Sequence, residues 1–283
     1  MPITIIILTY NEEKNIEACL NSVCSFAKEI FIVDSYSTDK TLEIAKRYTN
    51  NIYQHSFETQ ARQFNWALDN LQINTEWVMR LDADERVTQE LANELCEKLL
   101  SFSSDITGLY FKRKVYFMDR FIKHGGYYPT WLLRIWRKGK ARSEEQILNE
   151  HIILLEGKSA YLRYDIIDWN QKGLSFWTEK HNNYSARFAS ELIAIKDSSI
   201  KELSSINVSL FGSQEERKRW LKQNLYVSLP LFIRTFIYFI YRYFFRLGFL
   251  DGKEGLIFHF LQGFWYPFLV DAKICEYEKQ LRK

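Results

Sequence analysis

The sequence has little proline and glycine, with 4 and 11 residues respectively among 283. These counts are too low for disordered linkers, so most of the chain is expected to fold. Its four cysteines show no C-x-x-C spacing, which predicts reduced thiols and argues against a disulfide framework. No uncharged apolar run reaches the roughly 18 residues of a spanning helix, and MPITIIILTY lacks a basic n-region. We therefore expect neither a spanning helix nor a signal peptide.

Positive charge is concentrated in the last quarter of the chain. From Gln214 onward there are 12 Lys and Arg against 7 Asp and Glu, whereas the preceding residues carry 26 against 28. The same region is rich in aromatic residues. A basic, aromatic tail on a near-neutral body indicates an anionic surface as partner, either a membrane or a nucleic acid.

The first hundred residues alternate between buried strands and helices. Continuous apolar runs predict strands at 3–8, 29–34, 51–55 and 77–81, with amphipathic helical patterns between and after them. Strands that alternate with helices of about a dozen residues predict βαβ units and a mainly parallel sheet. The expected fold class is therefore α/β.

The pattern changes after residue 105. Longer antiparallel strands are expected at 108–117 and 130–142, a short strand within 144–158, and helices beyond 174. We divide the chain into a mainly α/β part, residues 1–213, and a helical region, residues 214–283. The change of pattern divides the first part into two halves, residues 1–105 and 106–213.

Polar side chains follow three of the predicted parallel strands. They are Thr9 to Glu12, Asp34 with Ser35, and the pair Asp82 and Asp84 in MRLDADERV. Ligands of open α/β sheets bind outside the carboxyl ends of the strands, so these residues are expected to share one site. Carboxylate oxygens suit Mg²⁺ or Mn²⁺, which would neutralise the charge on a departing diphosphate.

Three stretches together resemble glycosyltransferase family 2. They are IIILTYNE (5–12), IVDSYSTDKT (32–41) and LDADE (81–85). The resemblance implies a GT-A fold, a nucleotide-diphosphate sugar as donor, a divalent metal and inversion of the anomeric centre. Order and spacing match over about residues 3–100. The resemblance implies that residues 1–213 are the catalytic domain, with a nucleotide-sugar half at 1–105 and an acceptor half at 106–213. Less specifically, GFLDGKEG (248–255) extends the likeness to bacterial surface-polysaccharide enzymes of the lipopolysaccharide-core β-1,4-glucosyltransferase-like branch.

The resemblance also implies roles for the residues of the first two stretches. Tyr10 and Glu12 would line the nucleotide pocket, and Thr9 would shape the loop. Asp34 would lie near the base and ribose. Ser35 departs from the pattern, because many members have an acid there that is assigned to the base. This departure leaves the identity of the nucleotide open.

Three further residues are assigned to the donor by the same resemblance. Arg62 would face the diphosphate, Asp82 would approach the ribose, and Asp84 would ligate the metal. Two carboxylates separated by one residue can reach one site because a turn at Ala83 reverses the usual alternation of a strand. The resemblance thus predicts a metal-dependent donor site.

Inversion requires a base that deprotonates the acceptor hydroxyl as it attacks C1. The candidates are Glu144, Glu145 and Glu150, and the resemblance of LNEHIILLEGK to related bacterial enzymes favours Glu150. His151 is a candidate second metal ligand or a residue that orients Glu150. Arg134 is a candidate contact for the acceptor or the donor phosphate.

The tail shows a second pattern. Arg234, Tyr238, Arg242 and Arg246 recur every four residues, and aromatic and aliphatic residues fill most positions between them. Helices of this kind lie in the membrane interface, with arginines toward lipid phosphates. The alternatives are the core of a subdomain or a dimer face, which leaves a homo-oligomer open.

The favoured function is therefore an inverting glycosyltransferase at the cytoplasmic face of the bacterial inner membrane. It would use UDP-hexose or UDP-N-acetylhexosamine and a lipid-linked saccharide acceptor, with a membrane and not a nucleic acid as the partner surface. A nucleotidyltransferase is one alternative, but TYNEEKN lacks the glycine of a phosphate loop. A non-catalytic membrane-binding module is another, and it would leave the acidic cluster without a role.

Overall fold

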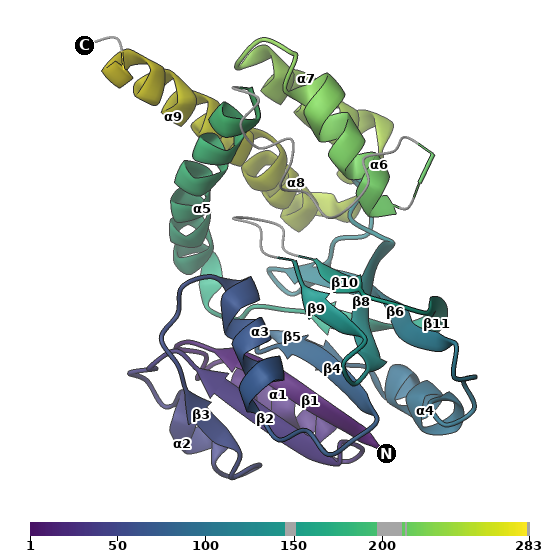
Figure 1. Cartoon of the computed structure of the whole chain (residues 1–283). Coiled ribbons are helices and arrows are strands. Elements are labelled where there is room, and N and C mark those ends of the chain that lie inside the picture. Colours follow the sequence, from purple (N-terminus) through teal and green to yellow (C-terminus); the bar gives the residue numbers. More distant parts are fainter. Residues whose placement is uncertain (145–150, 197–210, 213, 282–283) are drawn as a thin grey trace. The chain divides into compact units, whose positions relative to one another are not determined.

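The computed structural model describes residues 1–144, 151–196, 211–212 and 214–281, which form two compact units (Figure 1). The α/β unit contains residues 1–121, 128–144 and 151–172. The helical unit contains residues 122–127 and the described residues from Gly173 onward. The boundary between the units thus lies at Gly173, earlier in the chain than the expected division at Gln214.

Four parallel strands form the first half of the sheet in the α/β unit. They are β1 (Ile3–Thr9), β2 (Glu29–Asp34), β3 (Ile52–Gln54) and β4 (Trp77–Asp82), in the spatial order β3-β2-β1-β4. Every described side chain of β1 except Leu8 is buried, as expected for a strand covered on both faces. The predicted α/β fold with a mainly parallel sheet in its first half is confirmed.

The sheet continues with strands from the later part of the unit. Its order beyond β4 is β8 (Thr130–Arg137), β6 (Ile106–Phe117), β11 (Lys158–Asp168) and β5 (Glu85–Val87), with β7 (Arg120–Phe121) paired to β6. The β4–β8 and β8–β6 pairs are antiparallel, whereas β11 runs parallel to β6. A separate hairpin is formed by β9 (Ala141–Ser143) and β10 (Ile152–Leu154). Sequence analysis missed β11, because charged and apolar residues alternate irregularly in KSAYLRYDIID.

Helices cover both faces of this sheet. One apolar cluster joins the sheet to α1 (Ile16–Val23), α2 (Thr41–Ala45) and α4 (Gln89–Lys98). A second cluster on the other face joins it to α3 (Gln60–Asn70) and to the β9–β10 hairpin. Threonine side chains cap two of the helices, because Thr59 accepts from the backbone of Arg62 and Thr88 from that of Leu91. Both faces of the parallel half of the sheet are therefore covered.

The helical unit is built around the packing of its first helix against its last. Ala189 and Leu192 of α5 (Gly173–Lys196) contact Val270 and Ile274 of α9 (Tyr266–Leu281). Between them lie α6 (Gln214–Leu221), η1 (Lys222–Tyr226), α7 (Ile233–Ile240), η2 (Tyr241–Phe245), η3 (Gly248–Asp251), α8 (Gly252–Phe260) and η4 (Leu261–Trp265). None of the helices in the described ranges combines the length and apolarity needed to cross a bilayer.

Asp251 ties residues 122–127 to the tail. Its carboxylate accepts hydrogen bonds from the backbone N–H of His124 at 3.0 Å and from His124 Nδ1 at 2.6 Å. Arg242 Nε donates to the carbonyl oxygen of Gly125 at 2.8 Å, and the N–H of Gly125 donates to that of Arg246. These bonds explain why a loop between two strands of the α/β unit belongs to the helical unit.

Candidate active site

The carboxyl ends of β1, β2 and β4 meet at one edge of the sheet. Thr9 of β1 pairs in register with Asp34 of β2, and Leu8 pairs with Asp82 of β4. The polar strand ends recognised in the sequence are therefore neighbours in space. They form the candidate site.

Asp34 organises the loops that follow β1 and β2. Its carboxylate is fully buried and accepts hydrogen bonds from Thr9 Oγ1 at 2.9 Å, from the backbone N–H of Ser37 at 2.8 Å and from Gln54 Nε2 at 3.3 Å. A buried carboxylate needs such donors to offset its lost hydration. Asp34 thus fixes the backbone of the loop that follows β2.

The two loops interlock and expose two aromatic rings. Asn11 donates its N–H to Ser37 Oγ and accepts from the N–H of Thr38, each at 2.8 Å, while its backbone has φ 53°. The rings of Tyr10 and Tyr36 beside this junction are 57% and 56% exposed. Such rings offer stacking faces for a planar base. Sequence analysis identified Tyr10 but gave no role to Tyr36.

Glu12 lies half-buried beside a lysine from far along the chain. Its Oε1 accepts from Lys172 Nζ at 2.5 Å, its Oε2 accepts from Asn15 Nδ2 at 2.7 Å, and its N–H donates to Thr41 Oγ1. Burial raises the pKa of Glu12, and the nearby charge of Asp84 raises it further, while Lys172 and Asn15 oppose the rise. Glu12, Asp84 and Lys172 therefore form one electrostatic group.

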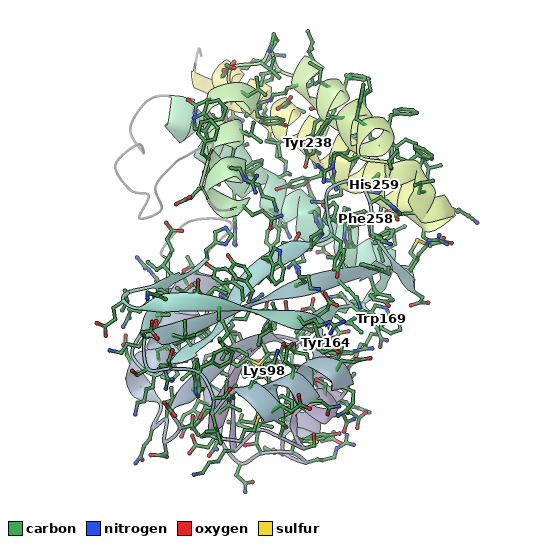
Figure 2. The ribbon with its side chains drawn as sticks, turned by 90° about the vertical axis from the view of Figure 1, so that its right-hand side faces the viewer. Lys98, Tyr164, Trp169, Tyr238, Phe258 and His259 are labelled. Atoms are coloured by element: carbon green, nitrogen blue, oxygen red, sulfur yellow. The ribbon has the colours of Figure 1, made fainter. Side chains whose placement is uncertain are left out.

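The segment after β11 supplies this lysine and closes on the edge of the sheet. Asn170 Nδ2 donates to Asp84 Oδ2 at 2.9 Å, and the N–H of Trp169 donates to the Asp84 carbonyl oxygen. The guanidinium of Arg86 lies 4.5 Å from the ring centre of Trp169, which extends from the end of β11 (Figure 2). Sequence analysis missed Asn170 and Lys172. The polar run NQK (170–172), just before the predicted helices beyond 174, was the available signal.

Arginines hold Asp82 from two strands. Arg80 Nε lies 3.3 Å from Asp82 Oδ1, and Arg134 donates to Asp82 Oδ2 at 3.0 Å and to Glu85 Oε1 at 3.1 Å. Although burial acts against it, the charges of Arg134 and Arg80 hold the pKa of Asp82 well below its usual range. Burial raises the pKa of Glu85 to about 8, Arg134 opposes that rise, and the charge of Asp82 adds to it. Asp82 is thus an anion whose orientation is fixed.

The position of Arg134 is set by an irregularity in the sheet. Leu133 pairs with Tyr110 and Ile135 with Leu109, so Arg134 is the extra residue of a bulge in β8. A bulge redirects a side chain out of the regular alternation. Arg134 is thereby buried beside Asp82 and Glu85. Its expected contact with the acceptor or the donor phosphate stays a prediction.

The other sequence-predicted donor residue, Arg62, lies at the start of α3. Its side chain is 59% exposed and forms an ion pair with Glu58 on the preceding turn. Nearby, Gln63 donates to Ser35 Oγ at 3.1 Å and contacts His55 Nδ1 through Oε1 at 2.7 Å. Ser35 therefore belongs to a hydrogen-bond network with Gln63 and His55.

The acidic residues at this edge fit the usual needs of Mg²⁺ or Mn²⁺. Such ions take one or two protein carboxylates and complete their shell with substrate phosphates and water. Asp84 lies at the edge with Glu12 close enough to feel its charge. Within the described part of the chain, no group of three His, Cys, Asp or Glu side chains is arranged as a complete protein cage. The residues therefore suit a metal that a bound diphosphate helps to hold.

The candidate bases lie after β9. Glu144 is buried, and its N–H donates to the carbonyl oxygen of His151 at 2.8 Å, which continues the β9–β10 pairing. Ser143 is anchored by Asn65 of α3, which exchanges two hydrogen bonds with its backbone. Glu145 and Glu150 lie outside the described residues.

Two of the three tail arginines are buried, so their predicted position toward lipid phosphates is wrong. Arg234 is 2% exposed and donates from Nε to Asp271 Oδ1 at 2.9 Å. Arg242 is 4% exposed and also donates to the hydroxyl of Tyr238, which Figure 2 labels in the helical unit. Only Arg246 of the three is exposed. The regular spacing identified one helix face, but that face is directed into the unit because Asp271 and the carbonyl of Gly125 provide partners there.

The opposite side of these helices is apolar and exposed. Each of its large side chains is at least about two fifths exposed, and Arg246 and Lys253 lie among them in the sequence. We call this set the apolar tail face: Phe236, Ile237, Ile240, Tyr241, Phe244, Phe245, Leu247, Phe249, Leu250, Leu256 and Phe260. An exposed set of this size is unusual for a soluble monomer and indicates an interaction surface.

Comparison with known proteins gives consistent findings. The family model described as Glycosyl transferase family 2 matches residues 4–168. An uncharacterized glycosyltransferase of Rickettsia typhi is 26% identical over 90% of this chain and 80% of that protein. The lipopolysaccharide core biosynthesis glycosyltransferase LpsC of Rhizobium meliloti is 32% identical over 54% of this chain and 57% of that protein, so the aligned part is little more than half of each.

Two solved structures match this chain at low identity. S. aureus TarS 1-349 is 18% identical, covering 99% of this chain and 92% of that one, with a TM-score of 0.43. Glucosyl-3-phosphoglycerate synthase from Mycobacterium tuberculosis, solved with Mg²⁺ and UDP, is 20% identical over 40% of this chain and 43% of that one, with a TM-score of 0.33.

Proposed function

The chain belongs to glycosyl transferase family 2, and we propose that it is an inverting enzyme that moves a sugar from a nucleotide-diphosphate sugar to a lipid-linked saccharide. The donor would be a UDP-hexose or UDP-N-acetylhexosamine, and the product part of a bacterial cell-surface glycan. One observation carries the proposal. Glu12, Asp84, Asn170 and Lys172 converge at the sheet edge where Tyr10 stands exposed.

In the proposed donor complex the base lies between the exposed rings of Tyr10 and Tyr36. Asp34 holds the loop around the ribose through Thr9 and Ser37, and Asp82 approaches the ribose in the orientation that its arginines fix. Lys172 lies where its ammonium can contact the diphosphate. Arg62, exposed at the start of α3, offers a second cation for the same group.

We propose Asp84 as the protein ligand of Mg²⁺ or Mn²⁺, with His151 as a further candidate. When bound, the metal would supply positive charge that stabilises the departing diphosphate. Asn170 orients the Asp84 carboxylate through its 2.9 Å hydrogen bond, in the manner of residues that position metal ligands. Lys172 adds a second positive charge at the same edge.

The acceptor hydroxyl loses its proton to a carboxylate as its oxygen forms the bond to C1. At the same time the bond between C1 and the diphosphate oxygen breaks, and the anomeric configuration inverts. We propose Glu150 as this base, with Glu144 and Glu145 as alternatives. The support is the position of Glu144, which is buried and follows the strand β9, whose Ser143 is anchored by Asn65.

We further propose that the apolar tail face binds the cytoplasmic face of the inner membrane as a peripheral contact. Its aromatic and aliphatic side chains suit the acyl boundary, and the exposed Arg246 and Lys253 suit anionic headgroups. A lipid-linked acceptor would reside at the same surface. Confinement to the membrane would then raise the effective concentration of acceptor.

The first test is calorimetric titration of UDP, and then GDP, with and without Mn²⁺. The Asp84→Ala variant is expected to lose metal-dependent binding. Asp69→Ala is the matched control, because Asp69 is an exposed carboxylate of the same unit that pairs with Arg142 away from the edge. If neither nucleotide binds, or if Asp84→Ala binds as the control does, the proposed donor site is wrong.

A further inference from the structure

A cluster of two lysines and one buried aspartate lies in the later half of the sheet. Lys114 Nζ is 3.2 Å from Asp165 Oδ2, and Lys112 Nζ is 3.7 Å from Asp165 Oδ1. The hydroxyl of Tyr128 also donates to Asp165 Oδ1 at 3.0 Å. Two ammonium groups thus share one carboxylate, and the cluster keeps a formal charge of +1.

On the other face of the same strand, positive charge is paired with negative charge. Arg113, between the two lysines in β6, points to the opposite side and pairs with Asp168 at 3.4 Å. Arg113 and Asp168 also act on Glu85, so this side is linked to the charges of the donor edge. The excess of two ammonium groups over one carboxylate lies on the face that carries Lys112 and Lys114.

Aromatic rings surround the lysines. Lys112 Nζ lies 5.6 Å from the ring centre of Trp131 and 5.9 Å from that of Tyr128. Tyr161, 61% exposed, stacks on Tyr110 at 5.1 Å and meets the edge of Trp131 at 5.0 Å. Aromatic faces with exposed surface can pack against the C–H faces of sugar rings, so this platform suits a saccharide.

This face also carries the β9–β10 hairpin, whose two strands flank the candidate bases in the sequence. Gly108 and Lys112 are two full alternations apart in β6 and share the face. A Cβ at Gly108 would meet the side chain of Leu154 of β10 at 2.7 Å, so the hairpin covers that end of the face. The lysine end is only partly covered, since the Lys112 and Lys114 side chains keep 20% and 32% of their exposure.

We propose that Lys112 and Lys114 bind an anionic group on the acceptor, while the ring of Tyr161 packs against the sugar that carries it. The inference rests on the proposed transferase function and narrows its acceptor to a saccharide that bears phosphate or carboxylate. Asp165 acts as a positioning residue, because its carboxylate holds both ammonium groups and the Tyr128 hydroxyl in place. The second ammonium supplies the charge that the acceptor neutralises.

The test is a ligand-observed NMR titration of the full chain with three soluble probes: glucose 6-phosphate, glucuronate and methyl glucoside. The wild-type chain is expected to bind at least one charged probe roughly tenfold more tightly than methyl glucoside, the scale of one charge-assisted hydrogen bond. The two charged probes distinguish phosphate from carboxylate. Equal affinity for all three probes would overturn the proposal.

Variants of Lys112 and Lys114 test whether these residues cause the preference for charged probes. The double variant Lys112→Met/Lys114→Met is expected to lose the preference for charged probes, and Lys112→Arg/Lys114→Arg to keep it. The matched control is Lys140→Met/Lys158→Met, which removes two exposed lysines that each have a carboxylate partner. A preference that survives in the first variant would refute the assignment.

UDP titration separates this inference from the proposed function. UDP reports on the donor edge, so UDP binding should be unchanged in all three variants if they fold. A wild-type chain that binds charged sugars but not UDP would retain the lysine cluster as a sugar site and refute the donor site. The reverse result would retain the transferase function and refute the anionic acceptor.

Discussion

Arg134 is the residue on which the acidic turn after β4 depends most. Its guanidinium is 9% exposed and bridges Asp82 and Glu85, whose side chains are 24% and 1% exposed. Replacing Arg134 with methionine leaves Asp82 with Arg80 but leaves Glu85 without its buried cation. Removing one partner of a buried ion pair costs about 3–5 kcal/mol, a large part of the 5–15 kcal/mol typical of a domain.

The assay is urea denaturation followed by fluorescence, with Arg47→Met as the control. Arg47 pairs with Glu17 on the surface, where both side chains are more than half exposed, so its loss should cost about 1 kcal/mol or less. Adding Glu85→Gln to Arg134→Met should recover about 2 kcal/mol, because glutamine still accepts the Asp82 N–H without a charge. An Arg134→Met variant as stable as the control, or a double variant no better than the single, would refute this reasoning.

Three further outcomes are expected. Lys172→Met should weaken UDP binding roughly tenfold or more, while exposed Lys40→Met should not; equal affinities by calorimetry would contradict the assigned contact. Phe245→Ser/Phe249→Ser should reduce co-sedimentation with anionic phosphatidylglycerol vesicles severalfold, and unchanged sedimentation would argue against the apolar tail face as the membrane contact. Burial lowers the pKa of His181 from 6.5 to about 4, so the helical unit should lose up to about 3 kcal/mol as the pH falls through that interval. The reason is that the neutral ring stacks on Trp177 and donates to the Trp177 carbonyl oxygen in the folded state. Urea titrations at pH 7 and 4.5 should show this loss of stability in the wild type and not in His181→Phe.

The parallel half of the sheet was predictable because its signals are local. β1 and β2 are short apolar runs, and the residues after them are polar, so Thr9 and Asp34 could be placed at one edge by the topology rule alone. The same rule could not find Lys172. Its strand, β11, has no clean alternation, and its contact with Glu12 spans 160 positions of the chain.

In the tail, the sequence pattern predicted a helix face but not whether that face is exposed. A repeat of four residues places Arg234 and Arg242 on one side of a helix, and this was correct. The repeat does not say whether that side faces solvent. Asp271, 37 positions after Arg234, decides the matter by providing a buried anion, and the apolar side is left exposed instead.

At the donor edge the acids come from early in the chain and most of the cations from later. Glu12, Asp82, Asp84 and Glu85 all come from the first hundred residues, and burying such a group of acids without counter-charge is unfavourable. Apart from Arg80 and the amide of Asn15, the groups that offset them come from later in the chain, namely Arg113 in β6, Arg134 in β8 and the segment 170–172 after β11. The parallel half therefore carries the family motifs but not the charges that hold them in place. Because these contacts are far apart in sequence, the donor edge should acquire its geometry only after β8 and β11 have joined the sheet.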